Sequence, residues 1–312
     1  MPDLIEKTDI PAQRGESAAP AAKPEKARSL GKDAWDDLRR KPIFLISAAL
    51  ILLLLVMAIA PGLFTSVDPR AGDLRNHYLT PPNYGHLFQA DWFGYDGQGR
   101  SIYARMVFGA RASITVGVLV TVAVTVVGGI VGMVAGYFGG WVDTLLSRLT
   151  DVFFGIPLLL GALVVLNAFA VRTVWSVVFA LTFLGWTQMA RVMRGSVVTV
   201  KQADFVTAAK ALGAGTVRIM FRHILPNAVA PVIVVATIAL GGYIATEATL
   251  SFLGIGLQDP TISWGIDINS AQKVIRTAPF ALFFPAGMLS LTVLAFIMLG
   301  DAVRDALDPK LR

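Results

Sequence analysis

Cysteine is absent from this sequence of 312 residues. Its absence excludes disulfides, thiol nucleophiles and thiolate metal sites, and it leaves no sign of the redox compartment. Charged residues are scarce, at 15% against roughly 25% in soluble domains, whereas 55% of the residues are hydrophobic and the mean hydropathy is +0.64. This composition excludes an ordinary soluble domain and predicts a chain that lies in a bilayer.

Catalytic motifs are also missing. No nucleophile and base stand at a diagnostic spacing, and no G-x-x-x-x-G-K-[ST] phosphate loop is present, because Gly31-Lys32 is followed by Asp33 without an upstream partner glycine. His77 and His86 are too isolated in the sequence to form a metal site. We therefore predict no catalytic residue, no metal site, no cofactor bound by this chain and no hydrolysis of ATP by the chain alone.

The net charge of +6 and the pI near 9.7 indicate an excess of basic residues. Nucleic acid binding is disfavoured, because no basic cluster is interleaved with base-stacking aromatic residues. In a membrane protein, excess Lys and Arg is typical of cytoplasmic loops that face anionic lipid. We expect contact with membrane lipid and none with nucleic acid.

Six apolar stretches are long enough to cross a hydrocarbon core of about 30 Å, and no strand pattern accompanies them. The sequence therefore predicts an all-α membrane protein with six transmembrane helices. The predicted spans cover residues 43–64, 112–142, 152–171, 173–190, 224–246 and 277–300. We expect the third span to kink at Pro157, after a charged turn with Asp143, Arg148 and Asp151, and the fifth to run on to Leu250.

The predicted organisation has three parts. Residues 1–41 are expected to form a disordered cytoplasmic tail with a short amphipathic helix near Trp35 and Leu38, residues 42–111 the first transmembrane helix and a long extracytoplasmic loop, and residues 112–312 a five-helix core with a cytoplasmic loop over 201–226. Ala58 and Ala60 have the spacing of a signal-peptide cleavage site, but the long preceding tail and Pro61 favour an uncleaved span.

Lysine and arginine set the predicted orientation. They gather before the first span, between the fourth and fifth spans, and at the C-terminus, and these regions fall on one side of a six-span chain. By the positive-inside rule this side, with both termini, is cytoplasmic. Arginines also occur in the loop over 66–111, but interspersed aspartates weaken their effect.

Four glycines in the second span follow one another at intervals of four residues, which lines them along one helix face. These are Gly128, Gly132, Gly136 and Gly140. Small residues on one face let helices approach closely in lipid. We interpret this face as a helix-packing surface, and the alternative is a wall of a translocation path.

The polar stretch over 204–226 predicts two short helices joined at Gly213, which stands where a left-handed residue ends a helix. Thr216 is expected to cap the second helix, and Pro226 to begin the next span. Apolar residues recur at helical spacing in both helices: Phe205, Ala208, Ala209 and Leu212 in the first, and Val217, Met220, Phe221 and Ile224 in the second. Such a hairpin either lies on the membrane surface or meets a cytoplasmic partner.

This stretch resembles the loop of binding-protein-dependent ABC importer permeases, whose pattern is Glu-Ala-Ala, three residues, Gly, nine residues, Ile, one residue, Leu-Pro. The sequence has Thr207-Ala208-Ala209, Gly213 and Leu225-Pro226 in that register, with Thr207 in the Glu position and His223 in the Ile position. The run from His223 to Asn227 resembles the form common in the peptide-permease branch. Without a carboxylate at position 207, contact with an ATPase is expected to depend on shape more than on charge.

Three further stretches resemble the same branch, and the resemblance covers residues 41–312. They are Phe93-Gly94-Tyr95-Asp96 with Gly99-Arg100 and the run from Gly109 to Ser113; the run from Glu247 to Gly256 followed by Ser263-Trp264-Gly265; and Gly300-Asp301, Arg304-Asp305, Leu307-Asp308-Pro309 and Leu311-Arg312. The chain is thus identified as a member of the dipeptide/oligopeptide (and nickel) permease family, as a C-type subunit.

The resemblance implies an ABC type I importer permease-like fold in the inner membrane of a prokaryote. It implies a second homologous permease subunit, two ABC ATPase subunits that bind ATP and Mg, an extracytoplasmic substrate-binding protein, and a di- or oligopeptide substrate. The expected ATPase-coupling residues are Phe205, Thr207, Ala208, Ala209, Leu212, Gly213, His223 and Pro226.

Glu247 is an ionisable residue at membrane depth, which makes a functional role the default expectation. With Ser251 and Phe252 it is a candidate for a gate or a substrate path. Its alternatives are a hydrogen bond that fixes a helix end, contact with a peptide amino terminus, and proton coupling. The rival functions are an ion-coupled secondary transporter or channel, disfavoured because no broken-helix pair or internal repeat is evident, and a receptor or scaffold without transport.

Overall fold

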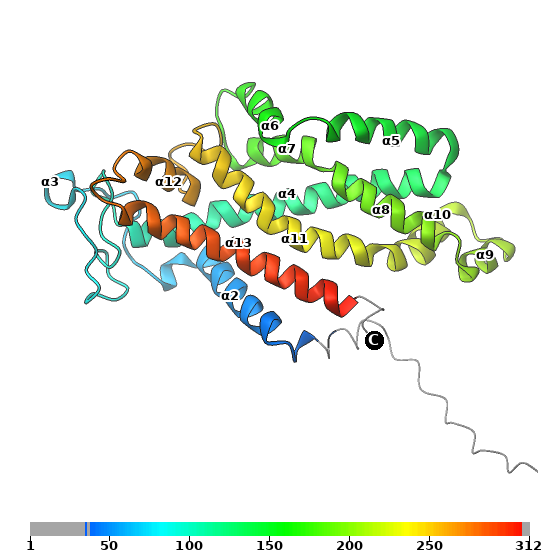
Figure 1. The fold of residues 1–312 in the computed structure, drawn as a ribbon, viewed down its shortest axis with the longest axis horizontal. Helices are drawn as coiled ribbons and strands as arrows, with labels where there is room; N and C mark the ends of the chain where they lie inside the picture. Colours follow the sequence, from blue (N-terminus) through cyan, green and yellow to red (C-terminus); the bar gives the residue numbers. More distant parts are fainter. Residues whose placement is uncertain (1–34, 36–37, 308–312) are drawn as a thin grey trace, which may run out of the picture.

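The computed structural model describes residue 35 and residues 38–307 of the chain, and in this part the regular structure is helical apart from two isolated bridges, between Gly72 and Arg100 and between Tyr95 and Ser101. Figure 1 shows an elongated bundle with its helices roughly along one axis. The predicted tail lies almost entirely outside the described residues. Leu38 is described, and it is buried against Ala302 and Ala306.

Four helices are long and apolar enough to cross a membrane: α2 (Pro42–Ile59), α4 (Ile102–Phe138), α11 (Leu225–Phe252) together with the turns before it from Thr216, and α13 (Phe280–Leu307). Two bent pairs raise the number to six if each pair is one span. They are α5 (Gly140–Phe154) with α6 (Leu158–Asn167), bent by 84°, and α7 (Val174–Gly185) with α8 (Thr187–Val200), bent by 46°. The prediction of an all-helical membrane protein is thus confirmed, and its six transmembrane helices correspond to the number obtained when each bent pair is one span.

Three predicted details were wrong. Helix α4 begins at Ile102, within the predicted outer loop, because Ser101 caps it by accepting a hydrogen bond from the Ala104 N–H. The acidic residues expected in a turn before the third span lie inside α5 instead. The two bent pairs also remove the argument that broken helices are missing.

The remaining elements are short: η1 (Pro61–Leu63), α3 (Leu74–His77), α9 (Asp204–Ala211), α10 (Thr216–Arg218), the π-helix η2 (Ile219–Ile224) and α12 (Trp264–Gln272). They gather at the two ends of the bundle, with α3 and α12 at one end and α9 and α10 at the other (Figure 1). We call the end formed by residues 60–101 and 253–279 the loop end, and the end formed by residues 201–224 the hairpin end.

Three of the four glycines predicted to share a face bring α4 against α8. A Cβ atom at Gly128, Gly132 or Gly136 would lie under 3.0 Å from the backbone of α8, so no larger residue fits without moving that helix. Gly140 does not belong to this surface. The chain turns at Gly139 and Gly140, whose φ angles are +68° and +55°, and a Cβ at Gly140 would meet nothing within 4 Å.

Candidate functional site at the two ends of the bundle

The hairpin end is anchored by a few buried apolar side chains. Val206 and Ala209 of α9 are buried, and Val206 joins the core cluster that contains Ile219, Met220 and Ile224 of η2. Sequence spacing alone placed Ala209 on the same face as Phe205 and Leu212, but the structure turns Ala209 inward. Val206 was missed, although its spacing of three from Ala209 is typical of one helix face.

The opposite surface of the hairpin is apolar and open. Four large side chains are exposed there, with exposed fractions of 46% for Phe205, 89% for Leu212, 69% for Val217 and 61% for Phe221. Thr207 and Ala208 are exposed beside them. Exposed apolar side chains that gather on one polar segment are typical of a surface that meets a partner.

Gly213 separates the two helices. Its φ angle is +81°, a region that side chains with a Cβ rarely adopt, and its N–H donates to the Lys210 carbonyl at 2.9 Å. A Cβ at this position would meet nothing within 4 Å, so the requirement for glycine is one of backbone conformation alone. The prediction for Thr216 was wrong, since Gly215 is the residue before α10 and no side chain caps that helix.

The second half of the hairpin continues into α11 without a break. Residues Thr216–Phe252 form one 37-residue candidate span, in which η2 has π-helical geometry immediately before Pro226. Pro226 has no N–H, so it cannot donate a hydrogen bond to the carbonyl four residues earlier. This missing bond accounts for the altered pattern of helical hydrogen bonds there. The Asn227 side chain donates to the His223 carbonyl at 2.7 Å, and the His223 side chain is half-buried at this junction.

Polar contacts link the helices next to the hairpin to one another and, through Lys201, to the hairpin end itself. Ser196 of α8 donates to the Ala228 carbonyl of α11 at 2.8 Å, and Lys201 donates to the Tyr137 carbonyl at the end of α4. Arg194 of α8 makes two hydrogen bonds to Asp143 of α5, the longer one at 2.7 Å. A displacement of the hairpin would therefore reach α4, α5, α8 and α11.

Glu247 lies toward the opposite end of α11 and has no exposed surface. Ser251 donates to its Oε1 at 2.8 Å, and the Leu257 N–H donates to the Ser251 hydroxyl at 3.0 Å. Ser113 of α4 and Ser263, which caps α12, are also fully buried. In this conformation the Glu247 carboxyl group binds Ser251 of its own helix, and Ser251 in turn binds the loop that follows α11.

At the loop end, α12 packs over the end of α11. Trp264 is fully buried and donates from Nε1 to the Met106 carbonyl of α4 at 2.9 Å, while Asn269 donates to the Phe252 carbonyl at 2.5 Å. A Cβ at Gly265 would lie 2.6 Å from the Ala248 carbonyl oxygen, so glycine is needed for this close approach. The half-buried Phe252 thus contacts α12 through its backbone.

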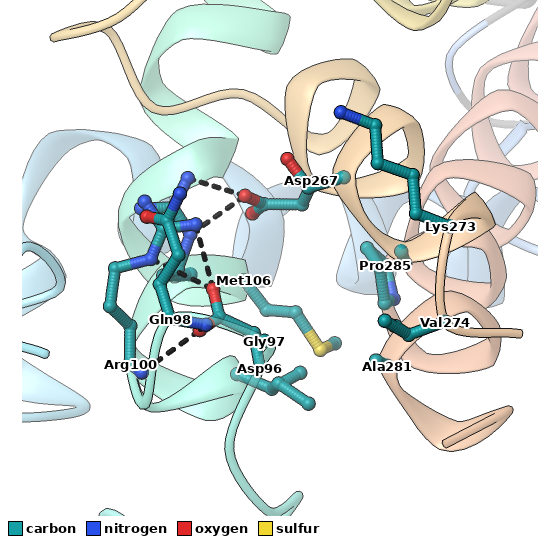
Figure 2. A pocket seen from close by; sticks show the side chains of 14 residues that line it. Asp96, Gly97, Gln98, Arg100, Met106, Asp267, Lys273, Val274, Ala281 and Pro285 are labelled. Atoms are coloured by element: carbon teal, nitrogen blue, oxygen red, sulfur yellow. Dashed lines mark hydrogen bonds and ion pairs between the residues drawn. The ribbon is translucent and has the colours of Figure 1, made fainter. Parts of the chain in front are cut away.

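A charged pocket of about 200 Å³ lies at the same end (Figure 2). Arg105 is 3% exposed and pairs with Asp267 of α12 through Nε at 2.7 Å, while Arg100 pairs with Asp96 through Nη2 at 2.7 Å. Burial raises the pKa of the Asp267 carboxyl group, and the neighbouring Arg105 opposes that rise. Sequence reasoning treated these residues as loop charges, because a pair separated by 162 positions leaves no local pattern.

Within the described residues, no group of three or more His, Cys, Asp or Glu side chains is arranged to hold a metal ion. The two ends instead hold structural features that could transmit movement. One is an exposed two-helix hairpin whose second half continues into a long helix, and the other is a buried polar network at the far end of that helix.

Two family models match the sequence. The first, described as the binding-protein-dependent transport system inner membrane component, matches residues 128–312, and the second, the N-terminal TM domain of oligopeptide transport permease C, matches residues 29–82. The chain belongs to the binding-protein-dependent permease family. Members of this family are membrane subunits of ABC importers, so this chain is a multi-pass inner membrane protein and not itself an enzyme.

Curated relatives match along nearly the whole chain. The oligopeptide transport system permease protein OppC of Bacillus subtilis (strain 168) is 37% identical over 288 residues, 92% of each chain. The dipeptide transport system permease protein DppC of the same organism is 38% identical over 91% of this chain and 87% of its own length. The glutathione transport system permease protein GsiD of Shigella flexneri serotype 5b (strain 8401) is 38% identical over 95% and 96%.

Proposed function

We propose that this chain is one of two permease subunits of an ATP-driven importer of short peptides. The relatives named above carry oligopeptides, dipeptides and glutathione, which is itself a tripeptide. The chain spans almost their full length, and this supports a substrate of the same chemical class.

The remaining subunits follow from what this chain lacks. It has no phosphate loop, so ATP and Mg would bind to two separate ATPase subunits. The distribution of Lys and Arg supports a cytoplasmic hairpin end with cytoplasmic termini. The loop end then faces an extracytoplasmic binding protein that delivers the peptide.

The observation that carries the proposal is the hairpin itself. Its exposed residues Phe205, Leu212, Val217 and Phe221 offer a surface for an ATPase cleft, and its second half belongs to the continuous span that ends at Phe252. A movement of the ATPases would push α9 and α10, and the push would pass through η2 into α11. Thr207 stands where the family pattern has Glu, so in this proposal the contact depends more on shape than on a carboxylate at that position.

At the other end of α11, Glu247, Ser251 and Phe252 would fix an outer gate. Their hydrogen bonds hold the helix end to the segment before α12, so a movement of α11 would carry that segment with it. Alternating access then requires the hairpin and this network to move together.

Substitution of Gly213 tests the proposal. In the complete complex in proteoliposomes, Gly213→Val forces a β-branched residue into a left-handed conformation, whereas Gly213→Asn tolerates that conformation. We expect Gly213→Val to keep ATP turnover but to lose most peptide uptake per ATP hydrolysed, and Gly213→Asn to retain both. Normal uptake by an assembled Gly213→Val complex would contradict the role given to the hairpin.

A further inference from the structure

An elongated groove runs from a cavity lined by α4, the start of α7 and two loops of the loop end to a cavity between α2 and α4. It consists of two adjoining cavities of about 530 and 390 Å³ that share Arg111 and Thr115. The first cavity is lined by the polar residues Arg70, Arg111, Thr115 and Thr261 and by the apolar residues Phe108, Ala112, Val174, Pro260 and Ile262. The second is lined, apart from Arg111 and Thr115, by the apolar residues Leu55, Ala58, Ile59, Ile114, Val118 and Leu119.

Arg111 marks the polar end of this groove. Its Nε donates to the Ala58 carbonyl and its Nη2 to the Ile59 carbonyl, each at 2.9 Å, and these carbonyls belong to the last turn of α2. A cation at the C-terminal end of a helix interacts favourably with the helix dipole. Because α2 ends there, Arg111 lies at the depth where a transmembrane helix leaves the hydrocarbon core.

The surface below Arg111 is apolar for the depth of one leaflet. From Arg111 to Val122 the helix rises by about 16 Å at 1.5 Å per residue. This is close to half of a hydrocarbon core about 30 Å thick. Val122, Val126 and Ile130 continue the exposed stripe further along α4.

The polar end is cationic. Arg70 donates from Nη2 to the Pro260 carbonyl at 3.3 Å and lines the same cavity as Arg111. The acidic residues next to these elements in the sequence, Asp68 and Asp259, do not line the cavity, and Asp68 accepts a hydrogen bond from the Arg70 backbone. Two guanidinium groups above an apolar groove match an anionic head group above an acyl chain.

We infer that this groove binds one anionic glycerophospholipid, with its phosphate at Arg111 and Arg70 and one acyl chain along Ile114, Val118 and Leu119. An apolar helix of another subunit would leave the two guanidinium groups without a counter-charge. A free phosphate ion would leave the apolar half of the groove empty.

Native mass spectrometry of the complete complex, purified in mild detergent and supplied with phosphatidylglycerol, tests this inference. We expect one retained phosphatidylglycerol per copy of this chain that inorganic phosphate does not displace. Arg111→Gln should reduce retention about tenfold, as expected for the loss of a charge-assisted hydrogen bond. Leu119→Trp, which fills the apolar half and leaves the contacts of Arg111 with α2 in place, should also abolish retention.

Arg276→Gln is the matched control, since it removes one exposed cation from the loop end away from the groove. Equal retention of phosphatidylglycerol by the original chain and by all three variants would show that the lipid binds nonspecifically to the surface, and it would contradict the inference. Displacement by inorganic phosphate would also contradict it, as would a cross-link from a cysteine at position 119 to the second permease subunit in place of lipid.

Discussion

The loop end and the hairpin end differ in the side chains that they bury. At the loop end charged and polar groups are buried and paired, as in Arg105 with Asp267 and Trp264 with the Met106 carbonyl. At the hairpin end large apolar groups such as Leu212 and Val217 are exposed. Large apolar side chains such as Leu63, Tyr84 and Leu87 are exposed at the loop end as well, so the two ends differ in their buried groups, which include charged pairs at the loop end and are apolar at the hairpin end.

The largest expected effect comes from breaking the buried ion pair at the loop end. Asp267→Asn leaves the Arg105 guanidinium buried without a counter-charge, and such a loss typically costs about 3–5 kcal/mol. We expect a large fall in the thermal unfolding midpoint of the purified complex. Asp259→Asn, an exposed acidic residue in the same region, is the control and should leave the midpoint unchanged. Equal midpoints for both variants would show that the pair does not hold α12.

A smaller loss should follow from Trp264→Phe, which removes the donor to the Met106 carbonyl and leaves a small void. The lost hydrogen bond and packing should cost about 1–3 kcal/mol. Trp141→Phe changes the same residue type at an exposed position of α5 and should cost little. Denaturation followed by tryptophan fluorescence compares the two, and a larger effect at Trp141 would contradict the contrast between buried and exposed sites.

At the hairpin end the same kind of truncation should separate stability from assembly. Leu212→Ala removes an exposed side chain, so unfolding should change by no more than about 0.5 kcal/mol. The ATPase subunits should nevertheless co-purify less well. Val206→Ala, at a buried position of the same helix, should do the reverse by lowering stability first. If Leu212→Ala destabilises the chain more than Val206→Ala does, the two faces of α9 have been assigned the wrong way round.

The smallest expected effect is the change in stability at acidic pH that Asp91 of the loop end causes. Burial acts to raise the pKa of Asp91, but hydrogen bonds from His86 and Asn83 outweigh it and lower the pKa below its ordinary value of 3.8. A lowered pKa stabilises the fold above pH 3.8, and this contribution is lost as the pH falls through the folded-state value. The difference in unfolding midpoint between the original chain and Asp91→Asn should therefore shrink on acidification. A difference that grows on acidification would reverse the sign of this argument.

Sequence reasoning worked best where the pattern is local. The length of the apolar stretches predicted the spans, and the position of Gly213 predicted where the first helix of the hairpin ends. Sequence reasoning failed where the position or packing of a residue depends on tertiary contacts. The start of α4 was placed too late because Arg105 and Arg111 were taken as loop charges, although one is buried against Asp267 and the other binds the end of α2. Gly140 was added to a helix face because the positive φ angles at Gly139 and Gly140 leave no sequence signal beyond glycine itself.

The absence of cysteine allows the central contrast to be tested directly, because a single introduced cysteine is the only thiol in the chain. Leu212→Cys and Tyr84→Cys place that thiol at exposed positions of the hairpin end and of the loop end. In the assembled complex, a bifunctional cross-linker at position 212 is predicted to capture an ATPase subunit, and one at position 84 is predicted not to. Capture of the ATPase from position 84, or its failure from position 212 in an intact complex, would contradict the account.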